Sequence, residues 1–401
     1  MGGEEDYNWD IYPERDAIII GTQDMLLSRV LNRGYGMSRY KWPTHFGMLN
    51  NDCLWIMDEV QLMGVGLTTS VQLEAFRKHF GTEKGTDTTW MSATINHEWL
   101  KSVDFKHESK DILTIELTEN DNLKQGIKKV LNSNKVLNKV KMNEYDYKVL
   151  LDEVLREHSP GTRTLVMFNT VSRAVKFYHE LNKSKPSVDL LLIHSHFRNP
   201  ERAPILKRFL ETPGNNGIIV VSTQVIEAGV DISAKTLFTE VAPWASLIQR
   251  IGRCNRYGEF DLGKIFWIDL LDFKSNNYYS PYSEKDLSES QSILLKIDGN
   301  NMAQESFPKI NSSLGDIDVI RPKDIIELFD STTDITGQDI DVSRFIRNDQ
   351  NSNCQVFWRD LADENSLKDE PFPKSDELCS APINDVMTLV KKRKALGYGI
   401  R

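Results

Sequence analysis

Short apolar runs alternate with segments of helical periodicity along the first two thirds of the chain. The runs are rich in aliphatic and β-branched residues and end in small or polar residues, which is typical of buried strands. The segments between them repeat apolar residues at helical spacing. This alternation predicts a protein of the α/β class. The predicted strands lie at 16–22, 53–57, 89–94, 164–170, 189–193, 217–223 and 263–270, and the predicted helices at 23–31, 122–157 (two helices), 171–181 and 204–210.

Beyond residue 271 the periodicity weakens. Residues 272–320 are rich in Ser, Asn and Tyr, and residues 368–382 contain three prolines. A basic run at 391–394 is more typical of a solvated helix end than of a nucleic-acid patch. We identify no chemistry in this part. The sequence predicts four regions: a partial first domain at 1–120, a helical connection at 121–160, a second domain at 161–271 and an accessory C-terminal region at 272–401.

Composition narrows the class of protein. The chain has 401 residues and a net charge of -9, so any contact with nucleic acid must use a local basic stripe. Its four cysteines are scattered without the spacing of a zinc site or a disulfide framework, which fits a reducing cytoplasm. The acidic start has no secretory apolar region. No run approaches the ~18 apolar residues of a membrane span, so we expect no membrane contact.

Two adjacent acids end one predicted strand. Asp58 and Glu59 follow the apolar run 53–57. Magnesium–nucleotide chemistry uses such a pair, in which the first carboxylate holds Mg²⁺ and the second orients and deprotonates the attacking water. The alternative is a pair of acids that cap the next helix. Further along, Ser92 and Thr94 end another strand with small hydroxyl groups that suit a relay between two sites.

A second group of candidates follows the strand at 217–223. This strand delivers Thr223 to a tight turn that continues to Gly229 and Asp231, an arrangement that handles phosphate and ribose in open α/β sheets. The run 249–256 comes next. If it is helical, Gln249, Arg253 and Arg256 share one face, which would suit a triphosphate. The alternative is a solvated basic helix face.

Other strand ends carry polar residues of less specific meaning. Thr22 begins a predicted helix, where it can grip a nucleic-acid backbone or act as an ordinary N-cap. His194 and His196 point the same way from one strand, but no third ligand lies nearby in the sequence. We therefore favour polar strand-end residues facing a cleft over a metal site.

Four short motifs together resemble superfamily-two helicases. They are D-E-V-Q (58–61) and M-S-A-T (91–94) for the second and third motifs, and S-T-Q-V-I-E-A-G-V-D (222–231) and Q-R-I-G-R-C-N-R (249–256) for the fifth and sixth. With L-V-M-F-N-T-V-S-R-A (165–174), L-L-I-H-S-H-F-R (191–198) and the segment 244–259, the chain resembles the helicase core of the type I CRISPR interference helicase–nuclease over residues 16–271. Segments 355–360 and 376–379 are similar to its subtype G, formerly U.

The resemblance implies two RecA-like parallel-sheet domains, the first truncated at its N-terminus, and an ATP-dependent DNA helicase or translocase that needs Mg²⁺. It implies that Asp58 is the magnesium ligand and Glu59 the base. Ser92 and Thr94 would couple the ATP and DNA sites. The nucleotide contacts would come from Gly229, Asp231, Arg253 and Arg256 with Gln249 in support, and the DNA contacts from Thr22, Asn169, Thr170, His194, Arg198 and Thr223. The implied partners are single-stranded DNA displaced in interference and the RNA-guided surveillance complex.

The chain departs from the family pattern in several places. His196 stands where arginine is expected, which puts that DNA contact in doubt, whereas Gln61 still fits the family. The sequence contains neither a G-x-x-x-x-G-K-[ST] phosphate loop nor a His-Asp dipeptide. We therefore expect the C-terminal part of a helicase, which comes from a split or interrupted gene or from a truncated gene model. A split gene would imply a separate N-terminal half, with the phosphate loop and an HD nuclease, as a partner. The alternatives are another superfamily-two DNA or RNA helicase and a non-catalytic nucleic-acid-binding remnant.

Overall fold

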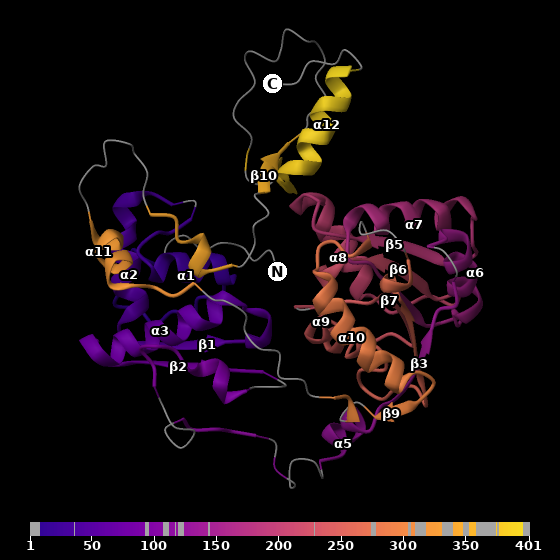
Figure 1. Cartoon of the computed structure of the whole chain (residues 1–401), viewed down its shortest axis with the longest axis horizontal. Helices are drawn as coiled ribbons and strands as arrows, with labels where there is room; N and C mark the ends of the chain where they lie inside the picture. Colours follow the sequence, from indigo (N-terminus) through magenta and orange to yellow (C-terminus); the bar gives the residue numbers. More distant parts are fainter. Residues whose placement is uncertain are drawn as a thin grey trace. The chain divides into compact units, whose positions relative to one another are not determined.

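The chain forms two compact units (Figure 1). The N-terminal unit comprises Gly3–Glu116 and Lys309–Gln350, and the central unit comprises Leu117–Pro308 and Asn351–Arg401. Lys309–Gln350, which the sequence analysis places in an accessory region, thus groups with the N-terminal unit. The computed structural model describes residues 9–35, 37–92, 96–106, 112–116, 118, 124–142, 145–227, 229–273, 278–303, 306–308, 318–330, 340–347, 353–357, 374 and 377–395.

A seven-stranded sheet forms the middle of the central unit, with strand order β5-β6-β4-β7-β8-β3-β9 (Figure 1). Every pairing from β5 to β3 is parallel, and β9 pairs with β3 antiparallel. This mainly parallel sheet confirms the predicted α/β class. The strands are β3 (Asn134–Lys139), β4 (Arg163–Met167), β5 (Asp189–Ile193), β6 (Ile218–Ser222), β7 (Thr236–Glu240), β8 (Gly263–Ile268) and β9 (Asn301–Ala303).

Helices cover both faces of this sheet (Figure 1). Strands β4, β6 and β7 are buried at every residue, as expected for central parallel strands between two helical layers. Helices α6 and α7 pack together, as do α9 and α10. The helices of this unit are α5 (Gln125–Leu131), α6 (Tyr147–Glu157), α7 (Val171–Lys183), α8 (Asn199–Leu210), α9 (Trp244–Ile251), α10 (Glu284–Ile297) and α12 (Ile383–Ala395).

Three strands of this sheet escaped the sequence analysis. Strand β3 lies between the two helices predicted for 122–157, where lysines and asparagines interrupt the apolar pattern. Strand β7 contains two threonines and has an acid at its end. Strand β9, the third, follows β8 along the chain and lies in the region where the periodicity weakens. Helix α8 begins at Asn199 rather than at 204, because Pro200 fits the first helical turn.

A smaller parallel sheet and helices α1, α2, α3 and α11 make up most of the described N-terminal unit. Strand β1 (Cys53–Met57) pairs with β2 (Thr86–Trp90), and α3 (Val65–Phe80) connects them. Helices α1 (Gln23–Val30) and α2 (Trp42–Asn50) precede β1. The strand predicted at 16–22 is wrong, because these residues form no strand, although the predicted helix that follows is α1. Strand β2 ends at Trp90, before the predicted Ser-Ala-Thr end.

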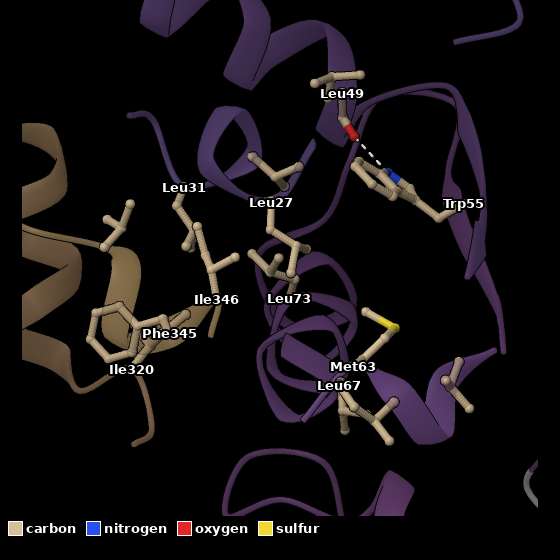
Figure 2. Close-up of a cluster of buried hydrophobic side chains, with 14 of the residues drawn as sticks. Leu27, Leu31, Leu49, Trp55, Met63, Leu67, Leu73, Ile320, Phe345 and Ile346 are labelled. Carbon is tan, nitrogen blue, oxygen red and sulfur yellow. Dashed lines mark hydrogen bonds between the residues drawn. The ribbon is translucent and has the colours of Figure 1, made fainter. Parts of the chain in front are cut away.

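The returning segment, residues 318–347, completes the core of the N-terminal unit. Its side chains Ile320, Phe345 and Ile346 join Leu27, Trp55 and their neighbours in one buried cluster (Figure 2). The indole of Trp55 donates a hydrogen bond to the Leu49 carbonyl at 2.8 Å. Helix α11 (Pro322–Phe329) and the 3₁₀ turn η9 (Ser343–Phe345) lie in this segment. The region beyond residue 271, where the sequence periodicity weakens, therefore contains part of a hydrophobic core.

Polar side chains of α3 fix the returning segment through its backbone. The Gln72 amide donates to the Ile320 carbonyl at 3.1 Å and accepts from the Ile320 amide at 2.9 Å. The Thr69 hydroxyl donates to the Phe345 carbonyl. Both side chains are fully buried, and a buried polar group without a partner would destabilise the fold, so these bonds select one position for the segment.

The C-terminal part of the central unit is a small hairpin followed by a helix. Strands β10 (Asn353–Val356) and β11 (Cys379–Pro382) pair antiparallel, and α12 packs against both. The Cys379 thiol donates to the His196 carbonyl at 3.2 Å. The motif segments predicted at 358–360 and 376 lie outside the described residues. Among the helices that the structure describes, none is long and apolar enough to cross a membrane.

Candidate functional site

Two acids follow β1 at the edge where a phosphate-handling site is expected. Asp58 is exposed, and its carboxylate accepts the backbone N–H of Glu59 at 2.9 Å. Glu59 has φ 52° and ψ 47°, which is the left-handed region that a non-glycine residue seldom adopts. This backbone turn directs the two neighbouring carboxylates differently, as separate metal-binding and base roles would require.

Gln61 links the acids to the end of β2. Its amide nitrogen donates to Glu59 Oε2 at 2.5 Å, and the Ser92 hydroxyl donates to Gln61 Oε1 at 2.6 Å. The motifs after β1 and β2 are therefore connected by a continuous chain of hydrogen bonds. The sequence analysis named Ser92 as a coupling residue but gave Gln61 no role in the link. Thr94, the other predicted coupling residue, lies outside the described residues.

In the central unit, predicted nucleic-acid residues follow three adjacent strands. His194 comes directly after β5 and Thr223 directly after β6, and Asn169 lies two residues after the end of β4. These three strands are neighbours in the sheet. The carboxyl ends of parallel strands meet at one edge, so the sheet brings these residues to the same side. Gln224 connects two of the strand ends, because its amide nitrogen donates to the Asn169 carbonyl at 2.8 Å.

These residues differ in how much surface they offer. Asn169, His194 and Thr223 are buried, and the Asn169 amide nitrogen donates to the Val241 carbonyl. The His194 ring stacks on Phe197 at 4.3 Å, and its burial, with a smaller effect of His196, lowers its pKa to about 4. His194 is therefore neutral near pH 7.

The more accessible residues of the set begin helices. Thr170 caps α7 by accepting the Arg173 N–H at 3.4 Å, and Arg198 caps α8 while pairing with Glu201. In the N-terminal unit, Thr22 caps α1 in the same manner. A helix N-terminus presents unpaired N–H groups, so these three positions are suited to contact with a phosphate backbone.

The arginines of 249–256 do not share a helix face, contrary to the sequence analysis. Helix α9 ends at Ile251, and Asn255 has φ 47° in a tight turn. Arg253 and Arg256 therefore extend from a turn, and only Gln249 lies on the helix. Cys254 forms an isolated β-bridge with Ala234. The backbone N–H groups of Cys254 and Asn255 both donate hydrogen bonds to nearby backbone carbonyls, and these bonds fix the backbone that carries both arginines.

A buried ion pair holds Arg253 in place. Arg250 is fully buried and donates from Nε to Glu227 Oε1 at 2.7 Å. The guanidinium of Arg253 donates to the carbonyl oxygen of the same Glu227 at 2.6 Å. The sequence analysis identified Arg253 but missed Glu227 and Arg250, the pair behind it.

Asp231 lies beside Arg256 on the exposed side of this turn. Arg256 Nε donates to Asp231 Oδ1 at 2.9 Å, and the Tyr257 hydroxyl donates to the same oxygen. The Tyr257 bond, followed by the charges of Arg256 and Arg253, lowers the Asp231 pKa. Gly229 precedes Asp231 with φ 74°, a conformation that favours glycine. The predicted nucleotide residues Asp231, Arg253 and Arg256 are thus electrostatically coupled.

Glu240 is a central residue that the sequence analysis missed. It ends β7 and is fully buried, where Arg173 binds its two oxygens at 2.7 and 2.9 Å. It also accepts the Tyr145 hydroxyl and the Asn169 backbone N–H. The signal for Glu240 in the sequence is that an acid ends an apolar run. A buried acid is costly without partners, so its position there indicates a buried ion pair. Glu240 positions the backbone of Asn169 rather than facing a ligand.

The carboxylates fit a magnesium–nucleotide role. Mg²⁺ is commonly held by one or two carboxylates, with waters and substrate phosphates completing its shell. The exposed Asp58 at a strand end provides such a ligand. Among the described residues there is no cluster of three or more His, Cys, Asp or Glu side chains.

Comparison with known proteins finds similarity to CRISPR-associated nuclease/helicases. A family model described as "CRISPR-associated nuclease/helicase Cas3, C-terminal" matches residues 160–259. A putative CRISPR-associated nuclease/helicase Cas3 of Methanocaldococcus jannaschii is 26% identical over 245 residues, which are 56% of this chain and 33% of the relative. The Cas3 of Methanothermobacter thermautotrophicus is 31% identical over 155 residues, 37% of this chain and 18% of the relative. The chain spans a third or less of these two relatives.

Solved structures agree on the fold. The crystal structure of T. fusca Cas3–AMPPNP has a TM-score of 0.54 at 17% identity and covers 78% of this chain and 38% of its own. A structure titled "CRISPR RNA-guided surveillance complex, pre-nicking" has a TM-score of 0.51 at 16% identity and covers 73% of this chain and 42% of its own. The family model and the sequence relatives show that the chain is similar to the C-terminal helicase part of CRISPR-associated nuclease/helicase Cas3 proteins.

Proposed function

We propose that this chain is the helicase component of type I CRISPR interference, translocating on single-stranded DNA with ATP and Mg²⁺. The observation that supports this most is the coupled group Asp231, Arg253 and Arg256, which lies within the segment matched by the Cas3 model. Two guanidiniums next to one carboxylate can bind a nucleotide through its phosphates and its ribose. The subtype G assignment and a cytoplasmic location are parts of the same proposal.

Each residue has a distinct task in this mechanism. Arg253 and Arg256 stabilise the negative charge that grows on the phosphates, with Gln249 in support, and Asp231, after the Gly229 turn, binds the ribose. Asp58 holds Mg²⁺, which supplies charge neutralisation when bound. Glu59 orients and deprotonates water, and Gln61 and Ser92 keep its carboxylate in position. Because Glu227 holds both Arg250 and Arg253, the arginine requires little reorganisation when phosphates bind.

The DNA contacts belong to the carboxyl edge of the central sheet and to α1. Thr22, Thr170 and Arg198 contact backbone phosphates at helix N-termini, while Asn169, His194 and Thr223 shape the edge beneath them. The partners are displaced single-stranded target DNA and the RNA-guided surveillance complex. Neither the glycine-rich phosphate loop nor an HD nuclease motif occurs in the sequence given.

An ATPase assay with the complete assembly tests this function. Arg253→Ala should slow DNA-stimulated hydrolysis by ~10³-fold, the scale of an arginine that stabilises the transition state. Arg208→Ala is the matched control, since Arg208 is half-exposed and pairs with Asp189 and Glu211 on the surface. An Arg253→Ala effect below about threefold in a folded protein contradicts the role of Arg253.

A further inference from the structure

Tyr257 holds one oxygen of the Asp231 carboxylate. Its hydroxyl donates to Asp231 Oδ1, and Arg256 Nε donates to the same oxygen at 2.9 Å. Within the part of the chain that the structure describes, no side chain or backbone group donates to the other oxygen, Oδ2. The Asp231 side chain is 73% exposed. The protein therefore occupies one oxygen of this carboxylate and leaves the other open to a ligand.

The turn that carries Tyr257 has a fixed backbone. Asn255 and Gly258, on either side of it, have φ 47° and φ 64°. The Asn255 amide nitrogen donates to the Phe260 carbonyl at 2.9 Å, and the Phe260 N–H donates to Asn255 Oδ1 at 3.0 Å. A side chain at position 258 would meet the Lys129 carbonyl oxygen at 2.5 Å, so the turn needs glycine there. Because a tyrosine side chain has only two torsions, this turn sets where the hydroxyl lies.

The two donors on Oδ1 restrict how the carboxylate can turn. An exposed aspartate rotates readily about its Cβ–Cγ bond, whereas a phenol and a guanidinium on one oxygen favour a single orientation. The Tyr257 bond is also the largest of the influences that lower the Asp231 pKa, so it favours the ionised form. An ionised carboxylate only accepts hydrogen bonds. The open Oδ2 is therefore an acceptor of fixed direction that suits a hydroxyl group.

We propose that Tyr257 is a positioning residue that makes the site select ribonucleotides, because it orients Asp231 so that Oδ2 accepts a ribose hydroxyl. This inference rests on the proposed function, which assigns the ribose to Asp231. Since Oδ1 already has two donors, the two ribose hydroxyls cannot bind one to each oxygen. A nucleotide without the hydroxyl at Oδ2 loses this bond and keeps the phosphate contacts of Arg253 and Arg256.

Kinetics with ATP and its two monodeoxy analogues, each lacking one ribose hydroxyl, test this role. In the complete assembly, the natural protein should prefer ATP to one analogue by about tenfold in kcat/KM, the scale of one hydrogen bond to a charged group. Tyr257→Phe keeps the ring and loses the hydroxyl, so this preference should fall to about twofold or less. The change should come from a higher KM for ATP, with the KM for that analogue unchanged.

Tyr178→Phe is the matched control. Tyr178 is partly buried on α7 of the same unit, where its ring lies beside His179, so loss of its hydroxyl should leave the preference for ATP as it is. An equal rise of the KM for ATP and for the analogue in Tyr257→Phe would indicate a purely structural role and overturn the proposal. An unchanged preference, or none in the natural protein, also overturns it. A lower KM for ATP would mean that Tyr257 competes with the ribose, which contradicts positioning as well.

Carbon NMR of the purified chain tests the contact itself, without nucleotide. With carboxyl-labelled aspartate, and Asp231→Asn to assign the signal, the Asp231 pKa should be higher in Tyr257→Phe than in the natural protein and unchanged in Tyr178→Phe. An equal pKa in all three proteins overturns the proposal. Failure of the positioning role alone leaves the Arg253→Ala effect on ATP hydrolysis intact. Failure of the proposed function removes that effect together with the nucleotide preference, and leaves the pKa difference.

Discussion

Glu227 and Arg250 show how a buried charge pair can set the position of a functional residue. Arg250 is fully buried and has its carboxylate partner at 2.7 Å, and Arg253 binds the carbonyl oxygen of the same glutamate. Such a pair is costly to form, but removing one partner leaves an uncompensated buried charge. The position of Arg253 therefore depends on a residue that need not touch the nucleotide.

Glu227→Gln should lower the free energy of unfolding of the central unit by ~3 kcal/mol, because the Arg250 charge would lose its partner without a change in side-chain shape. Urea unfolding followed by hydrogen exchange of β6 and α9 measures this loss. The control is Glu211→Gln, whose partner Arg208 is half-exposed, so the expected change is below ~0.5 kcal/mol. Equal effects of the two substitutions would contradict the prediction.

His194 should make the stability of the central unit depend on pH. Its pKa falls from 6.5 to about 4 on folding, mainly through burial, so the unfolded state binds the proton more readily. Its contribution to stability is present above pH 6.5 and is lost as the pH falls towards 4. His194→Phe keeps an aromatic ring beside Phe197 but cannot be protonated. The free energy of unfolding, measured across this pH range, should therefore fall less steeply in the variant; an unchanged slope would refute the assignment.

Among the elements, the sequence predicted those with a strong apolar period and missed those without one. Strands β1, β4, β5, β6 and β8 and helices α1 and α7 are continuous apolar or amphipathic runs, and their predictions are confirmed within a few residues. Strand β3 was missed because its buried positions include Lys135, whose burial lowers its pKa to about 8. The strand predicted at 16–22 is wrong because a short apolar run does not by itself identify a strand, and these residues form none.

The candidate site was predictable as a set of residues but not as a geometry. The motif letters identified Asp58, Glu59, Asp231, Arg253 and Arg256, and their functional roles stay predictions. The prediction that residues 249–256 share one helix face was wrong, because Asn255 adopts φ 47° and turns the chain. Sequence periodicity does not reveal such a turn. The bonds of Gln61, Glu227 and Glu240 connect residues from different strands, so spacing along the chain gives no indication of them.

The returning segment should contribute as much to the N-terminal unit as its own helices do. Phe345 is buried in the same cluster as Leu67 and Trp55, so Phe345→Ala should cost ~3–5 kcal/mol of unfolding free energy. Ile326→Ala, at an exposed position of α11, should change it by less than ~0.5 kcal/mol. Hydrogen exchange of α1 and α3 locates the loss in the N-terminal unit. Protection that changes only in the central unit would contradict the assignment of the segment.

At the scale of the whole molecule, we expect the isolated chain not to hydrolyse ATP at a useful rate. Catalysis of phosphoryl transfer depends on positioned phosphates, and the sequence has no glycine-rich loop to hold them. The measurement is DNA-stimulated ATPase activity of the purified chain, before and after addition of a polypeptide that carries the loop. Robust turnover by the chain alone would refute this; turnover only after addition would support a split helicase.

DNA binding by the complete assembly should depend on salt and be nearly blind to sequence. Contacts from Thr22, Thr170 and Arg198 to phosphates release counterions, so affinity should fall steeply as salt rises. Fluorescence anisotropy with two unrelated single-stranded oligonucleotides at several salt concentrations measures both properties. A strong preference for one base sequence at fixed salt would contradict backbone recognition.

The returning segment also sets the order in which the protein can be completed on the ribosome. Residues Ile320, Phe345 and Ile346 emerge only after every strand of the seven-stranded sheet has been translated. Domains usually fold in the order in which they are synthesised. Here most of the N-terminal unit is synthesised first, but its core lacks these three side chains until the strands of the central sheet have been synthesised. A premature stop codon between residues 309 and 340 would accordingly leave the central sheet intact and damage the N-terminal unit instead.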